Sequence, residues 1–185
     1  MRTLIIGGSG KIGKIIIKKN DVFTYYKNKI KGGVKFNILK DDVNKLIKKF
    51  KIDRIVLLSS ITDPDECLRN KKKSNLLNVE KTKKIISKII EQNIYFIFFS
   101  SEYIFDGKKG NYNEKSIVRP INLYGKQKYL IEKYIQKNTK NYCIFRIGKT
   151  YGDELNDKTL ISNFLTNLIK GKKLFYTASD QKFSP

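Results

Sequence analysis

The stretch Leu4-Ile5-Ile6-Gly7-Gly8-Ser9-Gly10-Lys11-Ile12-Gly13 decides the fold of this chain. Its glycines Gly7, Gly10 and Gly13 follow a short apolar strand and precede an apolar segment expected to be helical. The first glycine permits a tight turn, the second lets the backbone approach a pyrophosphate, and the third lets the helix pack closely on the strand. We therefore expect a dinucleotide-binding loop in which Lys11 and Ile12 also face the phosphates.

The rest of the chain continues the alternation of strands and helices. Further strands are predicted at residues 22–26, 34–38, 54–58, 94–99 and 142–147. Helices are predicted at residues 43–50 after Asp41 and Asp42, and at 76–91, 123–136 and 160–169, with a polar loop around Asp63-Pro64-Asp65. This alternation predicts an α/β fold, a doubly wound parallel sheet with helices on both faces.

The charge of the chain is extreme. Its 185 residues contain 39 Lys and Arg against 17 Asp and Glu, a net charge of +22. Such a balance suggests nucleic acid or an anionic membrane as partner. However, 34 of the basic residues are Lys and five are Arg, and they are scattered along the chain. Ile, Lys, Asn, Tyr and Phe, which all have A/T-rich codons, make up 99 residues. We therefore attribute the charge to composition and expect neither a nucleic-acid nor a membrane partner.

Other classes of protein are excluded by composition. The apolar run Ile94 to Phe99 is far shorter than the roughly 18 residues of a membrane-spanning helix. Cys67 and Cys143 provide no disulfide framework, and without histidine there is no Cys/His zinc site, so no metal is expected. A cytoplasmic, reducing setting is the expectation, with both cysteines as packing or surface residues.

The segment after the second predicted strand bears on the cofactor. It reads Thr24-Tyr25-Tyr26-Lys27-Asn28-Lys29 and contains no acidic residue. A carboxylate at this place accepts hydrogen bonds from the ribose of NAD, whereas Lys27 and Lys29 could pair with the 2′-phosphate of NADP. The sequence favours NADP(H), and NAD(H) stays open.

Three Tyr–Lys pairs have the spacing of a reductase's proton donor. They are Tyr25/Lys29, Tyr124/Lys128 and Tyr129/Lys133. A Tyr and a Lys four apart on a helix share a face, and a nearby ammonium lowers the pKa of a tyrosine. Because lysine is abundant, spacing alone cannot choose among them. Ligands of open α/β sheets bind at the carboxyl ends of strands, where Ser100 and Ser101 follow the strand 94–99. This placement favours Tyr124 and Lys128.

A family resemblance runs through the whole chain. It rests on the glycine motif and on Phe99-Ser-Ser-Glu-Tyr-Ile-Phe-Asp-Gly107, Tyr112-Asn-Glu114, Pro120-Ile-Asn-Leu-Tyr-Gly-Lys-Gln-Lys128 with Glu132, Phe145-Arg146 with Tyr151-Gly152, and Asp180-Gln-Lys-Phe-Ser-Pro185. The chain resembles the extended short-chain dehydrogenase/reductases, in particular the dTDP-4-dehydrorhamnose reductase branch. The resemblance implies a Rossmann-type fold and reduction of a nucleotide-linked 4-keto sugar with NAD(P)H in deoxysugar and surface polysaccharide biosynthesis.

The resemblance also implies site residues. The catalytic set is Ser101, Tyr124 and Lys128: Tyr124 protonates the keto oxygen, Ser101 hydrogen-bonds that oxygen, and Lys128 holds the nicotinamide ribose and keeps the tyrosine acidic. Further residues on the cofactor side are Asn37, Ile38, Ser59 and Ser60. Thr62, Glu102 and Tyr103 are assigned to the substrate side.

Departures from the branch leave alternatives open. Ser101 replaces the usual Thr, Glu102 the usual Asp, and Lys149 a common aromatic residue. Residues 1–148 are expected to form the cofactor domain and 149–185 the start of a truncated substrate-binding lobe, and whether this fragment is active alone stays open. An epimerase or dehydratase of the superfamily is one alternative. A non-catalytic NADP-binding subunit, like the regulatory subunit of methionine adenosyltransferase, is another, and a homodimer stays open.

Overall fold

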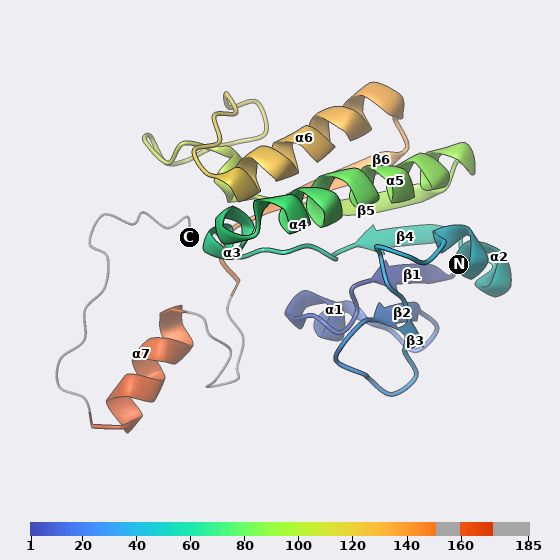
Figure 1. Ribbon diagram of the computed structural model, residues 1–185, viewed down its shortest axis with the longest axis horizontal. Helices are drawn as coiled ribbons and strands as arrows, with labels where there is room; N and C mark the ends of the chain where they lie inside the picture. Colours follow the sequence, from blue (N-terminus) through green and yellow to red (C-terminus); the bar gives the residue numbers. More distant parts are fainter. Residues whose placement is uncertain (151–159, 172–185) are drawn as a thin grey trace.

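The computed structural model describes residues 1–150 and 160–171 (Figure 1). Its strands form one parallel six-stranded sheet in the order β3-β2-β1-β4-β5-β6. The strands are β1 Thr3–Ile6, β2 Val22–Tyr25, β3 Val34–Lys35, β4 Arg54–Leu57, β5 Tyr95–Ser101 and β6 Tyr142–Ile147. The α-helices are α1 Lys11–Ile16, α2 Val43–Phe50, α3 Pro64–Arg69, α4 Lys71–Asn75, α5 Thr82–Glu91, α6 Leu123–Asn138 and α7 Leu160–Ile169. A π-helical turn, η1 Leu76–Lys81, joins α4 to α5, and a 3₁₀ turn, η2 Glu102–Ile104, follows β5.

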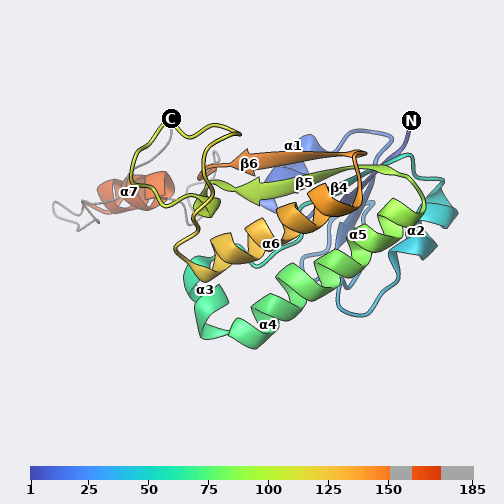
Figure 2. The ribbon, with the colours of Figure 1, turned by 90° about the horizontal axis from the view of Figure 1, so that it is seen from above.

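Helices cover both faces of the sheet, as the sequence predicts. Helices α5 and α6 lie side by side on one face, and α1 lies on the other (Figures 1 and 2). The core on the α5/α6 face also takes in α2 and joins side chains from the centre of the sheet to apolar side chains of the three helices. Its fully buried members are Leu4, Ile6, Ile55, Ile86, Ile89, Phe96, Ile131 and Ile135. The Rossmann-type fold is therefore confirmed.

The strand order creates a switch point between β1 and β4. The chain runs outward from β1 to β2 and β3, and then returns to β4, β5 and β6 on the other side. At such a point the two connections leave in opposite directions, and a crevice opens beyond the carboxyl ends of the strands. The glycine loop follows β1 at this point, and Ser59 follows β4.

Two local predictions are wrong. The segment expected to be a loop around Asp63 instead begins α3, because Asp63 caps the helix by accepting a hydrogen bond from Glu66 N at 2.8 Å and Pro64 occupies its first turn. Strand β3 is shorter than expected. Asn37 turns the chain, since its Oδ1 accepts from Leu39 N at 3.0 Å.

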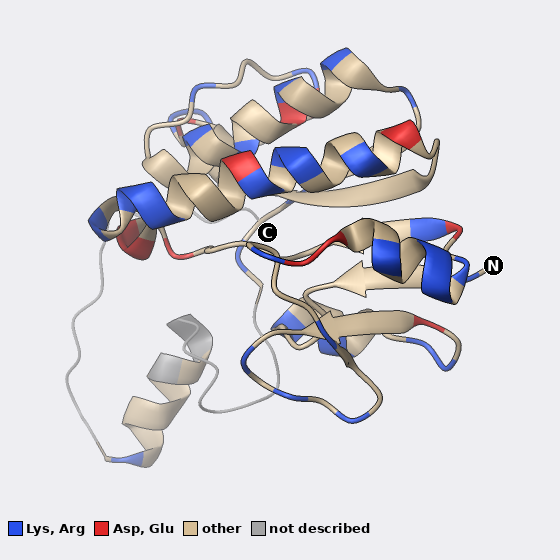
Figure 3. Cartoon of the chain, turned by 45° about the vertical axis from the view of Figure 1, so that its right-hand side comes forward, with Lys and Arg blue, Asp and Glu red and all other residues tan. Residues whose placement is uncertain are grey.

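Charged side chains are spread over the surface. Figure 3 shows Lys and Arg distributed over most helices and loops, with Asp and Glu between them. Within residues 1–150 and 160–171, no helix is both long and apolar enough to cross a membrane. In the same ranges no group of three acidic, Cys or His side chains is placed to hold a metal ion.

Candidate functional site

The glycine loop is held tightly at the switch point. Gly7 has a φ of +99°, and a Cβ there would lie 2.8 Å from Ser59 Oγ. A Cβ on Gly13 would lie 2.6 Å from the Cα of Gly8, so the start of α1 packs directly on the loop. Gly10 and Lys11 are exposed, and Ile12 is half-buried. The arrangement fits a bound dinucleotide, because the glycines of the loop carry no side chain that would obstruct an approaching phosphate.

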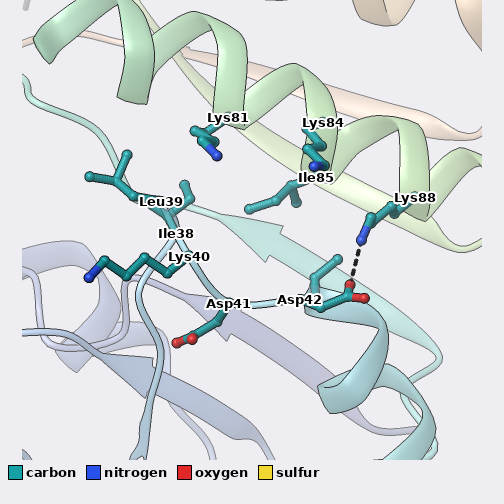
Figure 4. Close-up of a pocket in the computed structure, with 10 residues that line it drawn as sticks. Ile38, Leu39, Lys40, Asp41, Asp42, Lys81, Lys84, Ile85 and Lys88 are labelled. Atoms are coloured by element: carbon teal, nitrogen blue, oxygen red, sulfur yellow. Dashed lines mark hydrogen bonds and ion pairs between the residues drawn. The ribbon is translucent and has the colours of Figure 1, made fainter.

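The predicted adenosine residues lie after β2 and β3. Lys27 is exposed beyond the end of β2. Asn37 N donates to Asp41 Oδ2 at 2.6 Å, which fixes the turn that carries Ile38. Ile38 lines a pocket of about 160 Å³ between this turn and α5. Figure 4 shows Lys81, Lys84 and Lys88 across the pocket, with Lys88 paired to Asp42 at 2.7 Å. Ile38, predicted to lie near the adenine, is among the residues that line this pocket, and Tyr124 is not.

The segment after β4 is fixed by a buried amide. Asn78, on η1, accepts from Ser60 Oγ at 3.0 Å and from Ile61 N at 2.9 Å, and donates to Ile61 O at 2.9 Å. It also donates to Oε1 of Gln127 on α6 at 2.8 Å. Thr62, assigned to the substrate side, is exposed just beyond this anchored segment. The amide network thus holds Ser60 and the backbone of Ile61, and Ser60 is among the residues predicted to lie on the cofactor side.

Helix α6 brings Tyr124 to the end of β5. Asn122 caps the helix by accepting from Gly125 N at 2.8 Å. A Cβ on Gly125 would lie 2.0 Å from the carbonyl oxygen of Tyr103, so only glycine allows α6 to approach η2 this closely. As a result Tyr124 is buried, and its hydroxyl lies within reach of the side chains of Ser101 and Ser60. The structure thus brings together Ser60, Ser101 and Tyr124 from three separate segments.

The protonation of Tyr124 differs from the sequence expectation. Burial raises the pKa of Tyr124 well above its ordinary value, and the hydrogen bonds with Ser101 and Ser60 offset this in part. The expectation that Lys128 makes this tyrosine acidic is wrong for the geometry seen here. Lys128 Nζ lies 5.6 Å from the centre of the tyrosine ring and donates to the carbonyl of Phe99 at 2.8 Å. Desolvation of the phenol is therefore the largest effect, and the pKa of Tyr124 is raised.

Lys128 is itself strongly perturbed. Its side chain is buried, with Nζ 4.8 Å from the centre of the Phe98 ring. Desolvation lowers the pKa of Lys128 to about 8, while Cys67 and Glu132 oppose the shift. A lysine with such a pKa changes charge close to neutral pH. Perturbed groups of this kind gather at functional sites.

Glu102 and Tyr103, assigned to the substrate side, lie on the 3₁₀ turn that follows β5. The rings of Tyr103 and Tyr124 meet edge to face, with centroids 6.0 Å apart. Burial raises the pKa of Tyr103. Glu102 lies close to the end of β6, since a Cβ on Gly148 would be 3.1 Å from its Oε2. Tyr103 thus contacts Tyr124, Glu102 lies near Gly148, and the substrate role of both residues stays a prediction.

The structure separates the three Tyr–Lys pairs. Tyr124 and Lys128 are buried at the end of the sheet. Lys133 is exposed with its Nζ 5.6 Å from the centre of the Tyr129 ring, on the outer surface of α6. Tyr25 ends β2, and Lys29 is exposed beyond it, so this pair is on no helix. The pair favoured from its place in the sequence is therefore the buried one.

Sequence reasoning missed Asn78 and Gln127. Both are buried, and Gln127 also donates to Ser74 Oγ at 3.0 Å and to Asn75 Oδ1 at 2.7 Å. The sequence does show an amide residue in each of two predicted helices, at a position that faces the core, and this pattern could have indicated the pair. Cys67 is fully buried and donates to Ile61 O at 3.3 Å, in line with a packing role. The motifs Tyr151-Gly152 and Asp180–Pro185, and most of the segment 149–185, lie outside the described residues.

These features define a class. A parallel sheet of this order, a glycine loop at its switch point and a buried Ser, Tyr and Lys set beside it are the features of an extended short-chain dehydrogenase/reductase. The family model named RmlD substrate binding domain matches residues 1–185, and the chain belongs to that family. The resemblance to dTDP-4-dehydrorhamnose reductases is thereby confirmed.

Curated relatives carry two different names. The chain is 29% identical to methionine adenosyltransferase 2 subunit beta of Xenopus laevis, over 95% of this chain and 58% of the relative. It is 27% identical to a dTDP-4-dehydrorhamnose reductase of Aggregatibacter actinomycetemcomitans, over 100% of this chain and 62% of the relative. The chain thus spans about three fifths of the length of these proteins.

Solved structures share the fold. A hypothetical dTDP-4-dehydrorhamnose reductase from Sulfolobus tokodaii superposes with a TM-score of 0.74 at 31% identity, over 83% of this chain and 58% of that one. A Bacillus anthracis dTDP-4-dehydrorhamnose reductase in complex with NADP superposes with a TM-score of 0.72 at 18% identity. The match covers 94% of this chain and 61% of that one. MoeE5 in complex with UDP-glucose and NAD superposes with a TM-score of 0.78 at 16% identity. The match covers 93% of this chain and 62% of that one. The neighbours thus include both an NADP and an NAD complex.

Proposed function

We propose that this chain belongs to an NAD(P)H-dependent reductase of a nucleotide-linked 4-keto sugar. The observation that carries the proposal is the burial of Tyr124 beside Ser101 and Lys128 at the end of β5, at the same edge of the sheet as the glycine loop. The family and its dTDP-4-dehydrorhamnose reductase members support the same reaction. NADP(H) is the proposed cofactor, on the basis of Lys27 and the absence of an acidic residue after β2.

The residues present fit the cofactor. Gly7, Gly10 and Gly13 would hold its pyrophosphate, and Asn37 and Ile38 would contact its adenine. Ser59 would contact the part of the cofactor that crosses the switch point. NADPH, when bound, supplies the hydride. Lys128 is proposed to hold the nicotinamide ribose, and its hydrogen bond to the carbonyl of Phe99 on β5 supports this role.

The protein's own part in the reaction is proton transfer. As the keto carbon becomes an alcohol carbon, its oxygen takes up a proton, and the Tyr124 hydroxyl is the proposed donor. A high pKa holds that proton on Tyr124 until negative charge develops on the substrate oxygen. Ser101 is proposed to donate a hydrogen bond to the same oxygen. Glu102 and Tyr103 are proposed to contact the sugar from the far side of Tyr124.

A second candidate function rests on a specific finding. The relatives include methionine adenosyltransferase 2 subunit beta at 29% identity, slightly above the reductase at 27%. A non-catalytic NADP-binding subunit is therefore the alternative, and an epimerase or dehydratase with the same Tyr and Lys is a third. The intact Ser101, Tyr124 and Lys128 favour an enzyme.

The test compares binding with turnover. We expect the chain to bind NADPH and to oxidise it when a nucleotide-linked 4-keto-6-deoxy sugar is added. Tyr124→Phe should retain binding within about twofold and lose about 100-fold or more in turnover, the range expected for a missing proton donor. Tyr129→Phe, from the exposed pair, is the matched control. Binding without oxidation of NADPH would favour the regulatory alternative, and turnover that survives Tyr124→Phe would refute the catalytic assignment.

A further inference from the structure

A buried ion pair lies directly behind the proposed active site. Arg146 on β6 pairs with Glu132 on α6 through two nitrogens, with Nη2–Oε2 at 2.8 Å and Nε–Oε1 at 3.2 Å. The side chain of Glu132 is 0% exposed. Desolvation makes such a pair a weak source of stability compared with apolar side chains of the same size. The pair is therefore better explained by the positions in which it holds neighbouring groups than by a gain in stability.

Glu132 lies one helical turn from Lys128. Residues four apart on a helix are neighbours on one face, and the charge of Glu132 acts to raise the pKa of Lys128. The other titratable groups near Lys128 are the thiol of Cys67 on α3 and the phenol of Tyr124 on its own helix, and β5 contributes the carbonyl of Phe99. Of these groups, Glu132 is the only carboxylate, and it pairs with Arg146.

Arg146 extends the pair to a long segment near the substrate side. Its Nη1 donates to the carbonyl of Glu114 at 3.2 Å, and its guanidinium lies 5.5 Å from the centre of the Phe105 ring. Phe105 stacks on Tyr112 with centroids 4.4 Å apart. The Tyr112 hydroxyl donates to Asp106 at 2.5 Å. One guanidinium therefore joins α6 and β6 to both ends of the segment 105–116, which follows directly after Glu102 and Tyr103.

We propose that Glu132 and Arg146 are positioning residues of this site, with Glu132 supplying the negative charge behind Lys128 and Arg146 fixing the segment 105–116 beside the substrate residues. The catalytic meaning of the pair rests on the proposed function. The effect of Glu132 on Lys128 and the effect of Arg146 on the segment 105–116 do not rest on it, because both can be measured without substrate.

The first test measures the protonation of Lys128. Its ¹³Cε signal, assigned by its loss in Lys128→Arg, is followed from pH 6 to 11 in the full chain. In the wild type a midpoint near pH 8 is expected, since burial lowers the pKa of Lys128 to about 8. Glu132→Gln should lower the midpoint by about one unit, because a neutral amide no longer favours the ammonium. The double variant Glu132→Gln/Arg146→Met, which buries no unpaired charge, should lower it as well.

This result separates a positioning role from a merely structural one. If the pair only held the fold together, its loss would admit water and raise the midpoint toward the ordinary value for lysine. A raised or unchanged midpoint in both variants would overturn the role of Glu132. Lys126→Gln, an exposed position on the same helix, should leave the midpoint unchanged.

The second test measures the segment 105–116. Trypsin can cut after Lys108, Lys109 and Lys115 in this segment. Arg146→Met should increase the rate of these cuts about tenfold or more, whereas Lys126→Gln should stay within twofold of the wild type. Equal rates in Arg146→Met and the wild type would overturn the role of Arg146. Absence of NADPH oxidation would refute the proposed reductase and leave both of these results unaffected.

Discussion

Replacing Lys128 by Met should change how stability depends on pH. Lys128 is buried, and burial lowers its pKa from 10.5 to about 8. The unfolded chain therefore binds one more proton than the folded chain between about pH 8 and 10.5, so stability rises with pH in this window and the full penalty applies below it. A difference of about 2.5 between the two pKa values corresponds to roughly 3 kcal/mol.

Lys128→Met removes this penalty and also removes the hydrogen bond to the carbonyl of Phe99. We expect the variant to gain in stability relative to the wild type at pH 7, and this difference to shrink by roughly 3 kcal/mol as the pH rises to 10.5. Groups distant from Lys128 titrate equally in both proteins and cancel in the comparison. The variant should at the same time bind NADPH more weakly.

The assay is urea unfolding followed by circular dichroism at 222 nm, carried out on both proteins at half-unit steps from pH 6.5 to 10.5. Lys126→Met, on an exposed position of α6, is the control and should follow the wild type at every pH. A constant difference between Lys128→Met and the wild type across the whole range would show that Lys128 is not held in a desolvated, pKa-lowered state.

Three further outcomes follow from the packing. Gly125→Ala should destabilise the chain by about 3 kcal/mol in urea unfolding, because its Cβ would lie 2.0 Å from the carbonyl oxygen of Tyr103. Asn78→Ala should cost about 3 kcal/mol, since it leaves the buried Gln127 without one partner, and should speed hydrogen exchange at the amide of Ile61. Gly7→Ala should abolish NADPH binding in a fluorescence titration, because φ at this position is +99° and a Cβ would strike Ser59. A wild-type value in any of these measurements would refute the corresponding contact.

Much of the fold could be predicted because its signals are local. Strand β6 and helix α7 have the predicted bounds, and the glycine spacing placed the loop between β1 and α1. The prediction failed at α3, where Asp63 and Pro64 read as turn residues although the same types also begin helices. It failed again at the end of β3, where the side chain of Asn37 competes with the ladder for backbone partners.

The candidate site was less accessible to sequence reasoning. Tyr124 and Lys128 were chosen from three pairs by their place relative to a strand end, and the structure brings this pair to the end of β5. The prediction of a lowered pKa for Tyr124 was wrong, because burial raises this pKa. The degree of burial depends on how completely α6 and β5 exclude water. Asn78 and Gln127 were missed because their partners lie on other segments.

What the sequence by itself determined is the alternation of elements, the glycine loop and the family, since each is written in the order and spacing of neighbouring residues. What only the tertiary structure decided is the chemistry of the site. The buried Glu132–Arg146 pair joins residues 14 apart, and Asn78 bonds with Gln127 across 49 residues. Burial, protonation and hydrogen-bond partners depend on which distant segments meet, and spacing along the chain does not carry that information.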